Sequence, residues 1–127
     1  MNRPTHFEIL GDDPAKLGEF YTEIFNWEIA DWGGEEQAYF LATTGPEGTL
    51  GINGGLMERH FKQNVINTHD VENLDAALEK IKAAGGKKVH GPTEVPEVGM
   101  HCYCEDPQGN MFGIIEGFKK KALFKKT

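Results

Sequence analysis

The feature that most constrains the fold is a plan of secondary structure that occurs twice along the chain. Each half has a strand-like run, an amphipathic helix and then three short runs separated by turn residues. An offset of 57 residues maps the first predicted helix, 12–25, onto a second that we expect to begin after Asp70 and to end at Gly85-Gly86. The sequence therefore predicts an α+β fold of two βαβββ modules.

The helices are predicted from their caps and from apolar residues at helical spacing. Asp12 or Asp13 caps the first helix, and Pro14 suits its first turn. One face of this helix carries Leu17, Phe20, Tyr21, Ile24 and Phe25. Because one helix covers only one face of a four-stranded sheet, we expect the uncovered faces to form a curved eight-stranded sheet around a cavity.

The length of 127 residues fits one domain. We expect module 1 at about 1–58, module 2 at about 62–118 and a basic tail at 119–127. The predicted strands are 6–10, 27–32, 38–43 and 49–56 in the first half, and 65–69, 87–90, 100–104 and 110–117 in the second. Glycine and proline punctuate them, as at Gly91-Pro92.

Charge and cysteine content narrow the class of protein. The net charge of −7 argues against nucleic acid as a partner, because an acidic body repels a phosphate backbone. No apolar run approaches the ~18 residues that a membrane span needs, and the N-terminus lacks a secretory pattern. Cys102 and Cys104 are too poorly placed on one strand for a disulfide and are expected to be reduced. These features predict a cytoplasmic protein without a membrane partner.

Several short motifs follow one another along the chain: 6–9 leading into Asp13-Pro14, Phe20-Tyr21 to Trp27, Asp70-Val71, 83–86 and Asp106-Pro107-Gln108-Gly109-Asn110. In this order and spacing they resemble the vicinal oxygen chelate superfamily of glyoxalases, bleomycin-resistance proteins and extradiol dioxygenases. The resemblance covers nearly the whole chain. It implies the paired βαβββ fold, a ligand held in the curved sheet and dimers.

Metal-dependent members of the family hold a divalent ion with histidine and glutamate side chains, and the resemblance implies four positions for them. His6 matches the first position. The second falls on Gln63, whose amide is a poor substitute for imidazole on a transition metal. The third and fourth fall on Gly113 and Gly55. We therefore predict no metal site and no cofactor.

Without a metal, His6 and Glu8 are the candidate catalytic pair. Residues at i and i+2 share a strand face, so an imidazole and a carboxylate lie side by side and can exchange a proton. The structural alternative is that both are polar residues hydrogen-bonded in a groove, while Phe7 and Ile9 pack under the helix. Cys-x-Cys is expected to be core packing.

Glycines in the strands and aromatic residues predict a pocket for a planar or hydrophobic molecule. We place the ligand pocket at Gln63, Trp32, Tyr39, Gly55, Tyr103 and Gly113.

Two classes of function remain open. One is a glyoxalase-like small-molecule-binding protein acting as a metal-independent lyase or isomerase related to lactoylglutathione lyase. The other is a non-catalytic protein of the bleomycin-resistance type that sequesters its ligand. Whether the protein is an enzyme is left undecided by the sequence. A homodimer is expected, because dimers are common in the family and an open sheet edge is a liability.

Overall fold

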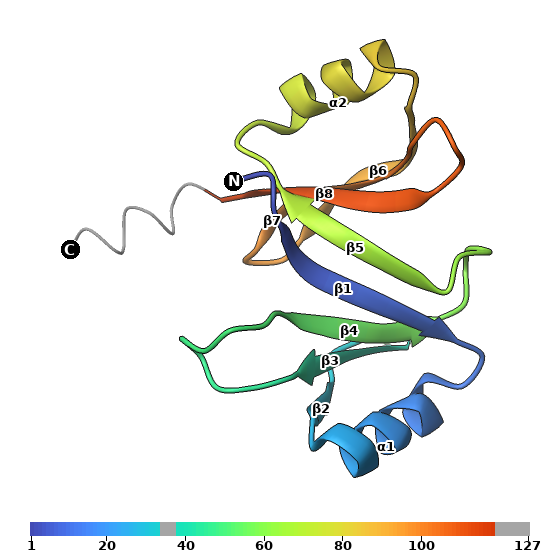
Figure 1. The fold of residues 1–127 in the computed structure, drawn as a ribbon, viewed down its shortest axis with the longest axis vertical. Coiled ribbons are helices and arrows are strands. Elements are labelled where there is room, and N and C mark those ends of the chain that lie inside the picture. Colours follow the sequence, from blue (N-terminus) through green and yellow to red (C-terminus); the bar gives the residue numbers. More distant parts are fainter. Residues whose placement is uncertain (34–37, 119–127) are drawn as a thin grey trace. The chain divides into compact units, whose positions relative to one another are not determined.

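A computed structural model describes residues 1–33 and 38–118 (Figure 1). The basic tail at 119–127 lies outside the described residues. The chain divides into two compact units, which are described separately. The first unit is Thr5–Asn67, and the second is Met1–Pro4 with Thr68–Thr127. The start of the chain joins the second unit because the Asn2 amide donates to the carbonyl of Asp70 over 2.7 Å.

The first unit contains a helix and four strands in the predicted βαβββ order. These are β1 (Pro4–Gly11), α1 (Pro14–Phe25), β2 (Glu28–Asp31), β3 (Tyr39–Thr43) and β4 (Asn53–Glu58). The strand order is β2-β3-β4-β1, in which β1 pairs with β4 in parallel and the other pairs are antiparallel. The parallel pair puts β1 beside the glycine-rich start of β4.

The second unit repeats this plan. Its elements are β5 (Val65–Asp70), α2 (Leu74–Ala83), β6 (Lys87–Val95), β7 (Gly99–Glu105) and β8 (Met111–Gly117). The strand order is β5-β8-β7-β6, with β5 and β8 parallel. Each unit thus carries a mixed four-stranded sheet and one helix, which confirms the α+β fold and its two βαβββ modules.

Helix α1 begins and ends as its sequence predicts, but it packs differently. The Asp13 carboxylate accepts a hydrogen bond from the Lys16 amide, and Asn26 ends the helix in the left-handed conformation. The helix packs closely against the sheet at Gly18, because a Cβ at this position would lie only 3.1 Å from the Ile29 side chain. The expected apolar face is wrong in part, because side chains expected to face the sheet are more than half exposed. These are Phe20, Ile24 and Phe25.

Helix α2 begins later than predicted. It starts at Leu74, with the Asn73 side chain accepting from the Ala76 amide over 2.8 Å. Glu116 on β8 accepts a further bond from the Leu74 amide over 2.7 Å. The two N-caps, Asp13 and Asn73, are therefore 60 residues apart, which corrects the offset of 57. This correction changes which residues of the two modules correspond.

Two of the predicted strands differ from the observed ones by more than two residues at one end. Strand β6 continues through Gly91-Pro92, where we expected a turn, and its pairing with β7 shifts register on both sides of His90. Strand β4 begins only at Asn53, because the preceding residues form a loop. Thr44 holds the end of that loop, since its amide donates to the Asn53 side chain over 2.9 Å.

The core of the second unit is small and includes both cysteines. Cys102 and Cys104 are fully buried free thiols that face α2, which confirms their expected role in core packing. Burial raises the pKa of Cys104 to about 11. The cluster is completed by Val71, Leu74 and Ile114.

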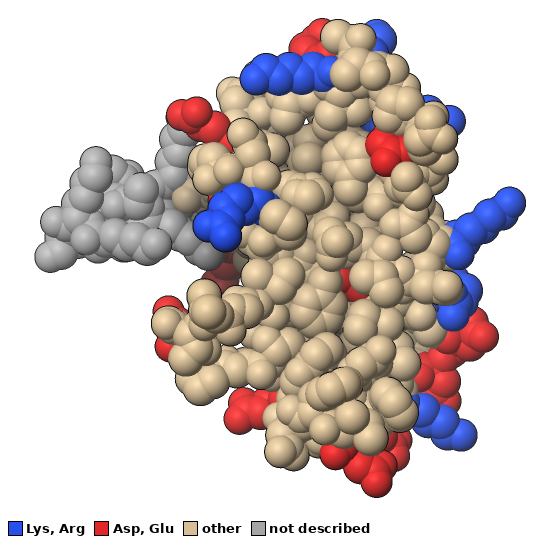
Figure 2. Space-filling model, viewed as in Figure 1, with Lys and Arg blue, Asp and Glu red and all other residues tan. Residues whose placement is uncertain are grey.

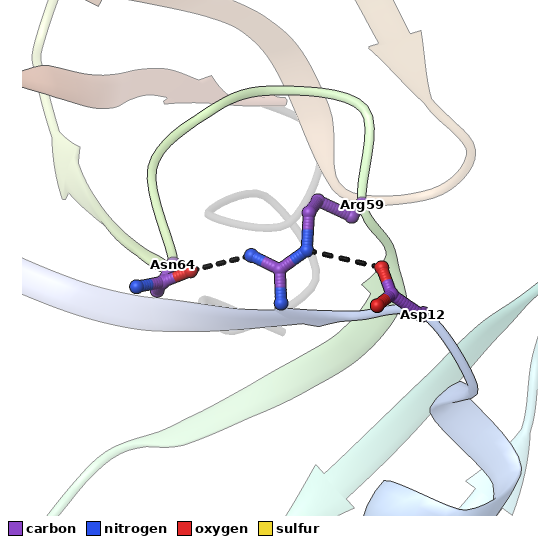
Figure 3. Close-up of polar contacts among 3 residues, drawn as sticks. All are labelled: Asp12, Arg59 and Asn64. Carbon is purple, nitrogen blue, oxygen red and sulfur yellow. Dashed lines mark hydrogen bonds and ion pairs between the residues drawn. The ribbon is translucent and has the colours of Figure 1, made fainter.

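The connector after β4 is fastened to the end of β1 (Figure 3). Arg59 Nε lies 3.2 Å from Asp12 Oδ1, and its Nη1 donates to the Asn64 side chain. Backbone bonds from Arg59 to Gly11 and from Leu10 to Asn64 join the same segments. These bonds hold the connector against the end of β1 just before β5 begins. Among the described residues, no helix is long and apolar enough to cross a membrane.

Candidate functional site

The two faces of β1 have different surroundings. Phe7 lies on the α1 face, with its ring 5.5 Å from that of Trp27, and Trp27 stacks on Tyr21 of α1. Strand alternation therefore places Glu8 on the opposite face, where it is 6% exposed. This is the side of β1 on which the sequence placed the candidate catalytic residues.

His6 and Glu8 are joined through the hydroxyl of Tyr39. Tyr39 donates to Glu8 Oε2 over 2.7 Å, and its oxygen lies 2.9 Å from His6 Nε2. The three side chains come from β1 and β3, on either side of β4. The sequence predicted all three residues for the site, but it gave Tyr39 only the role of an aromatic wall.

The hydroxyl reaches β1 because Gly55 on β4 has no side chain. Gly55 pairs with Glu8 on β1 and with Leu41 on β3. A Cβ at position 55 would lie 2.1 Å from the Tyr39 oxygen. The Tyr39 hydroxyl occupies the space beside Gly55, and that Gly55 contacts a ligand stays a prediction.

The site favours neutral His6. Burial lowers the pKa of His6 below its ordinary value of 6.5, and the charge of Glu8 opposes this in part. A neutral imidazole beside a carboxylate and a phenol is an arrangement that can accept a proton at one atom and stabilise the resulting charge through hydrogen bonds.

The second unit carries a corresponding polar pair. Thr68 on β5 pairs with Gly113 on β8, and His101 on β7 lies 3.1 Å from the Thr68 hydroxyl through Nε2. A Cβ at Gly113 would lie 2.3 Å from the Thr68 oxygen. Tyr103 and His101 meet in a T-shaped contact, with 4.5 Å between their ring centroids. The sequence singled out Gly113 and Tyr103 but gave no site role to Thr68 or His101.

Trp32 and Gln63 complete the predicted pocket set. Trp32 follows β2, is 47% exposed and meets the Tyr39 ring edge-on, with centroids 5.9 Å apart. Gln63 lies in the connector before β5, where its Nε2 donates to the carbonyl of Val65 over 2.8 Å. That Gln63, Tyr103 and Gly113 contact a ligand stays a prediction.

A hollow lies on the other face of the first unit, between α1 and the strands β2 and β3. Its volume is about 460 Å³, and it is lined by Ala15, Gly18, Glu19, Thr22, Glu23, Ile29 and Phe40. Figure 2 shows acidic side chains around α1. The hollow holds no histidine and is lined by α1, so we place the candidate site on the Glu8 face.

The family model described as "Glyoxalase/Bleomycin resistance protein/Dioxygenase superfamily" matches residues 3–114. The chain belongs to this superfamily. The match spans both βαβββ modules and includes the site residues of each.

Known proteins similar to this superfamily member share parts of its sequence or its fold. Proteins named as glyoxylases (CFP32) from Mycobacterium bovis and Mycobacterium tuberculosis are 37% identical over 46 residues, which is 36% of this chain and 18% of theirs. The methylmalonyl-CoA epimerase of Mycobacterium tuberculosis has a TM-score of 0.69 at 15% identity, covering 94% of this chain and 91% of the epimerase. A Streptomyces coelicolor methylmalonyl-CoA epimerase in complex with 2-nitronate-propionyl-CoA has a TM-score of 0.70 at 15% identity. The match covers 92% of this chain and 95% of that epimerase.

The superfamily's metal positions do not fit a metal in this chain. With Glu8 corresponding to Thr68 by strand register, the counterpart of His6 is Ile66 rather than Gln63, and Ile66 is fully buried. The space above the two glycines is taken by hydroxyl and imidazole groups. Residues 1–33 and 38–118 contain no group of three histidine, cysteine or acidic side chains that could hold a metal. His6 alone remains of the implied ligand set.

Proposed function

We propose that this protein binds a small oxygenated organic molecule on the Glu8 face of its first unit and acts as a metal-independent lyase or isomerase. The observation that carries the proposal is the hydrogen-bonded series His6, Tyr39 and Glu8. Burying the Glu8 carboxylate, which is 6% exposed and bonded to a phenol, costs free energy, so we infer that the carboxylate has a function. The His6 imidazole beside it supplies a group that can accept and release a proton.

The proposed chemistry is removal of a proton from a carbon next to a carbonyl group. His6 and Glu8 act as one unit, in which the imidazole accepts the proton and the carboxylate stabilises the charge that forms. Relatives with the same fold support this class of substrate, because their names describe epimerases of methylmalonyl-CoA.

Proton exchange with solvent tests the proposal. The purified chain would be incubated in D₂O with methylmalonyl-CoA and, separately, with the adduct of methylglyoxal and glutathione, and deuterium at carbon followed by NMR. Glu8→Gln is nearly isosteric, and we expect it to lower exchange by about tenfold or more, the effect of ~1.4 kcal/mol from a charged hydrogen bond. Glu19→Gln on α1 is the matched control and should leave the rate unchanged. Equal exchange by both variants would count against the proposal.

A second function is favoured by the exposed Trp32 ring beside Tyr39, which offers an aromatic surface for a ligand. In this case the protein sequesters its ligand without converting it, and the name of its superfamily includes bleomycin-resistance proteins. Binding of the same two probes, detected by calorimetry without deuterium incorporation, would favour this function over catalysis.

We further propose a homodimer. The short edge strand β2 and the exposed α1 residues Phe20, Ile24 and Phe25 support it, since open edges and apolar side chains are commonly covered by a partner. Sedimentation equilibrium at tens of micromolar should give twice the chain mass of 14.1 kDa. A single species at the chain mass would rule the dimer out at that concentration.

A further inference from the structure

The position of the Tyr39 hydroxyl is set by the strands around it. The side chain crosses β4 above Gly55, where any Cβ would lie 2.1 Å from the hydroxyl oxygen and 2.3 Å from the ring carbon that bears it. Trp32 meets the Tyr39 ring in a T-shaped contact, with 5.9 Å between the ring centroids. The phenol is therefore a fixed group between two side chains of β1 rather than one of many wall residues.

The directions of the hydrogen bonds follow from the number of protons available. The Tyr39 hydroxyl has one proton and gives it to Glu8 Oε2. Its oxygen can then only accept from His6, so the proton of the neutral imidazole lies on Nε2. We infer that Tyr39 is a positioning residue that fixes His6 as its Nε2–H tautomer and leaves Nδ1 as the basic atom of the site.

This assignment deepens the proposed function and rests on it for its chemical consequence. The substrate C–H bond breaks, its proton goes to His6 Nδ1, and the electron pair stays on the substrate as an enolate. The imidazolium keeps its Nε2 proton, which remains bonded to Tyr39 while Tyr39 remains bonded to Glu8. Return of the Nδ1 proton to carbon restores neutral His6. Glu8 thus acts through Tyr39 and His6, as a carboxylate orients histidine in other acid–base sites.

Nitrogen NMR tests the inference without any ligand. The full chain, labelled with ¹⁵N, would be studied above pH 6.5, where His6 is neutral, and its signals assigned with His6→Gln. We expect a protonated Nε2 and an unprotonated Nδ1, with slow exchange of the Nε2 proton. Tyr39→Phe should speed this exchange by about tenfold or more, because the bond to the phenol is lost.

Glycine variants separate positioning from general disturbance. Gly55→Ala should have the same effect as Tyr39→Phe, because its Cβ displaces the hydroxyl. Gly45→Ala is the matched control: its Cβ would meet Thr49 at an ordinary 3.6 Å, so the His6 signals should not change. If Gly55→Ala does not fold, Tyr39→Phe still decides the question.

Two results would overturn the inference: a proton on Nδ1 in the unaltered protein, or unchanged His6 signals in Tyr39→Phe. The proposed function fails separately, in the deuterium experiment. A fixed Nε2–H tautomer without exchange at carbon would leave the positioning role intact and remove only the lyase or isomerase activity.

Discussion

The two units use the same local design with different chemistry. In each, a glycine of the fourth strand lets a polar side chain of the third strand meet a polar side chain of the first. The first unit joins Tyr39 to the carboxylate of Glu8, whereas the second joins His101 to the hydroxyl of Thr68. The repeated backbone provides the place for such a pair, and the side chains decide whether it carries charge.

The helices also differ between the units, because α2 buries its apolar side chains more completely than α1 does. Helix α2 closes a core in which Leu74 and Ile114 are at most 5% exposed. Helix α1 approaches its sheet through Gly18 and leaves Ile24 55% exposed. The first unit thus combines a charged polar site with a helix that buries little apolar surface. The second unit combines a neutral polar pair with a buried apolar helix contact.

The largest expected effect is on the helix contacts. Ile114→Ala should lower the free energy of unfolding by about 2–5 kcal/mol, because it leaves a cavity in the core of the second unit. Ile24→Ala on α1 should change it by about 0.5 kcal/mol or less, since the side chain is exposed. Urea unfolding monitored by circular dichroism measures both. Similar losses in the two variants would show that α1 is covered in solution.

The two glycines should be nearly as sensitive. Gly55→Ala and Gly113→Ala each place a methyl group within 2.3 Å of an oxygen, and each should cost about 1–3 kcal/mol of stability. Gly45→Ala should cost much less. The same unfolding measurement applies, and a harmless Gly113→Ala would mean that the second pair is not held as the first is.

Removing one hydroxyl from each pair compares how much a charged and a neutral hydrogen bond contribute to stability. Tyr39→Phe breaks a bond to a carboxylate and should cost about 1.5–3 kcal/mol, whereas Thr68→Val breaks a neutral bond and should cost about 0.5–1.5 kcal/mol. Thermal unfolding of both variants in one buffer gives the order. The reverse order would contradict a charged bond in the first unit.

The smallest expected effect is the pH dependence from His6. Its pKa is lowered in the folded protein, so below pH 6.5 the unfolded chain binds a proton that the folded one does not. Stability should therefore be full above this pH and fall as the pH decreases through it, by at most about 1.4 kcal/mol per pH unit. His6→Gln should flatten the curve in urea titrations. A slope unchanged by His6→Gln would assign the effect to another group.

The sequence predicted the architecture because its signals are local. The Asp13 cap, the glycines at 85 and 86 after the second helix and the alternation that separates Phe7 from Glu8 all act within a few residues. The offset between the modules was wrong because Asp70 and Asn73 both have side chains that cap helices, and only Asn73 is bonded to the helix amides. That error made Gln63 rather than Ile66 the counterpart of His6.

The site was predicted only in part, for a physical reason. His6 and Glu8 are neighbours on one strand, so alternation brings them together. Tyr39 reaches them from β3, and this depends on pairing across β4 and on the absence of a Cβ at Gly55. The Thr68–His101 pair required the same kind of knowledge. Both pairs join strands that are far apart in the sequence, so the spacing of residues within one strand does not show which side chains meet.

The burial of both thiols in the second unit gives the protein an internal reporter. The first unit contains no cysteine, and Cys102 and Cys104 are fully enclosed with their pKa values raised by burial. An alkylating reagent that reacts with thiolates reaches these cysteines only when β7 and α2 separate. The rate of cysteine labelling in the unaltered chain, measured by mass spectrometry, therefore reports the opening of the second unit and does not report the opening of the first.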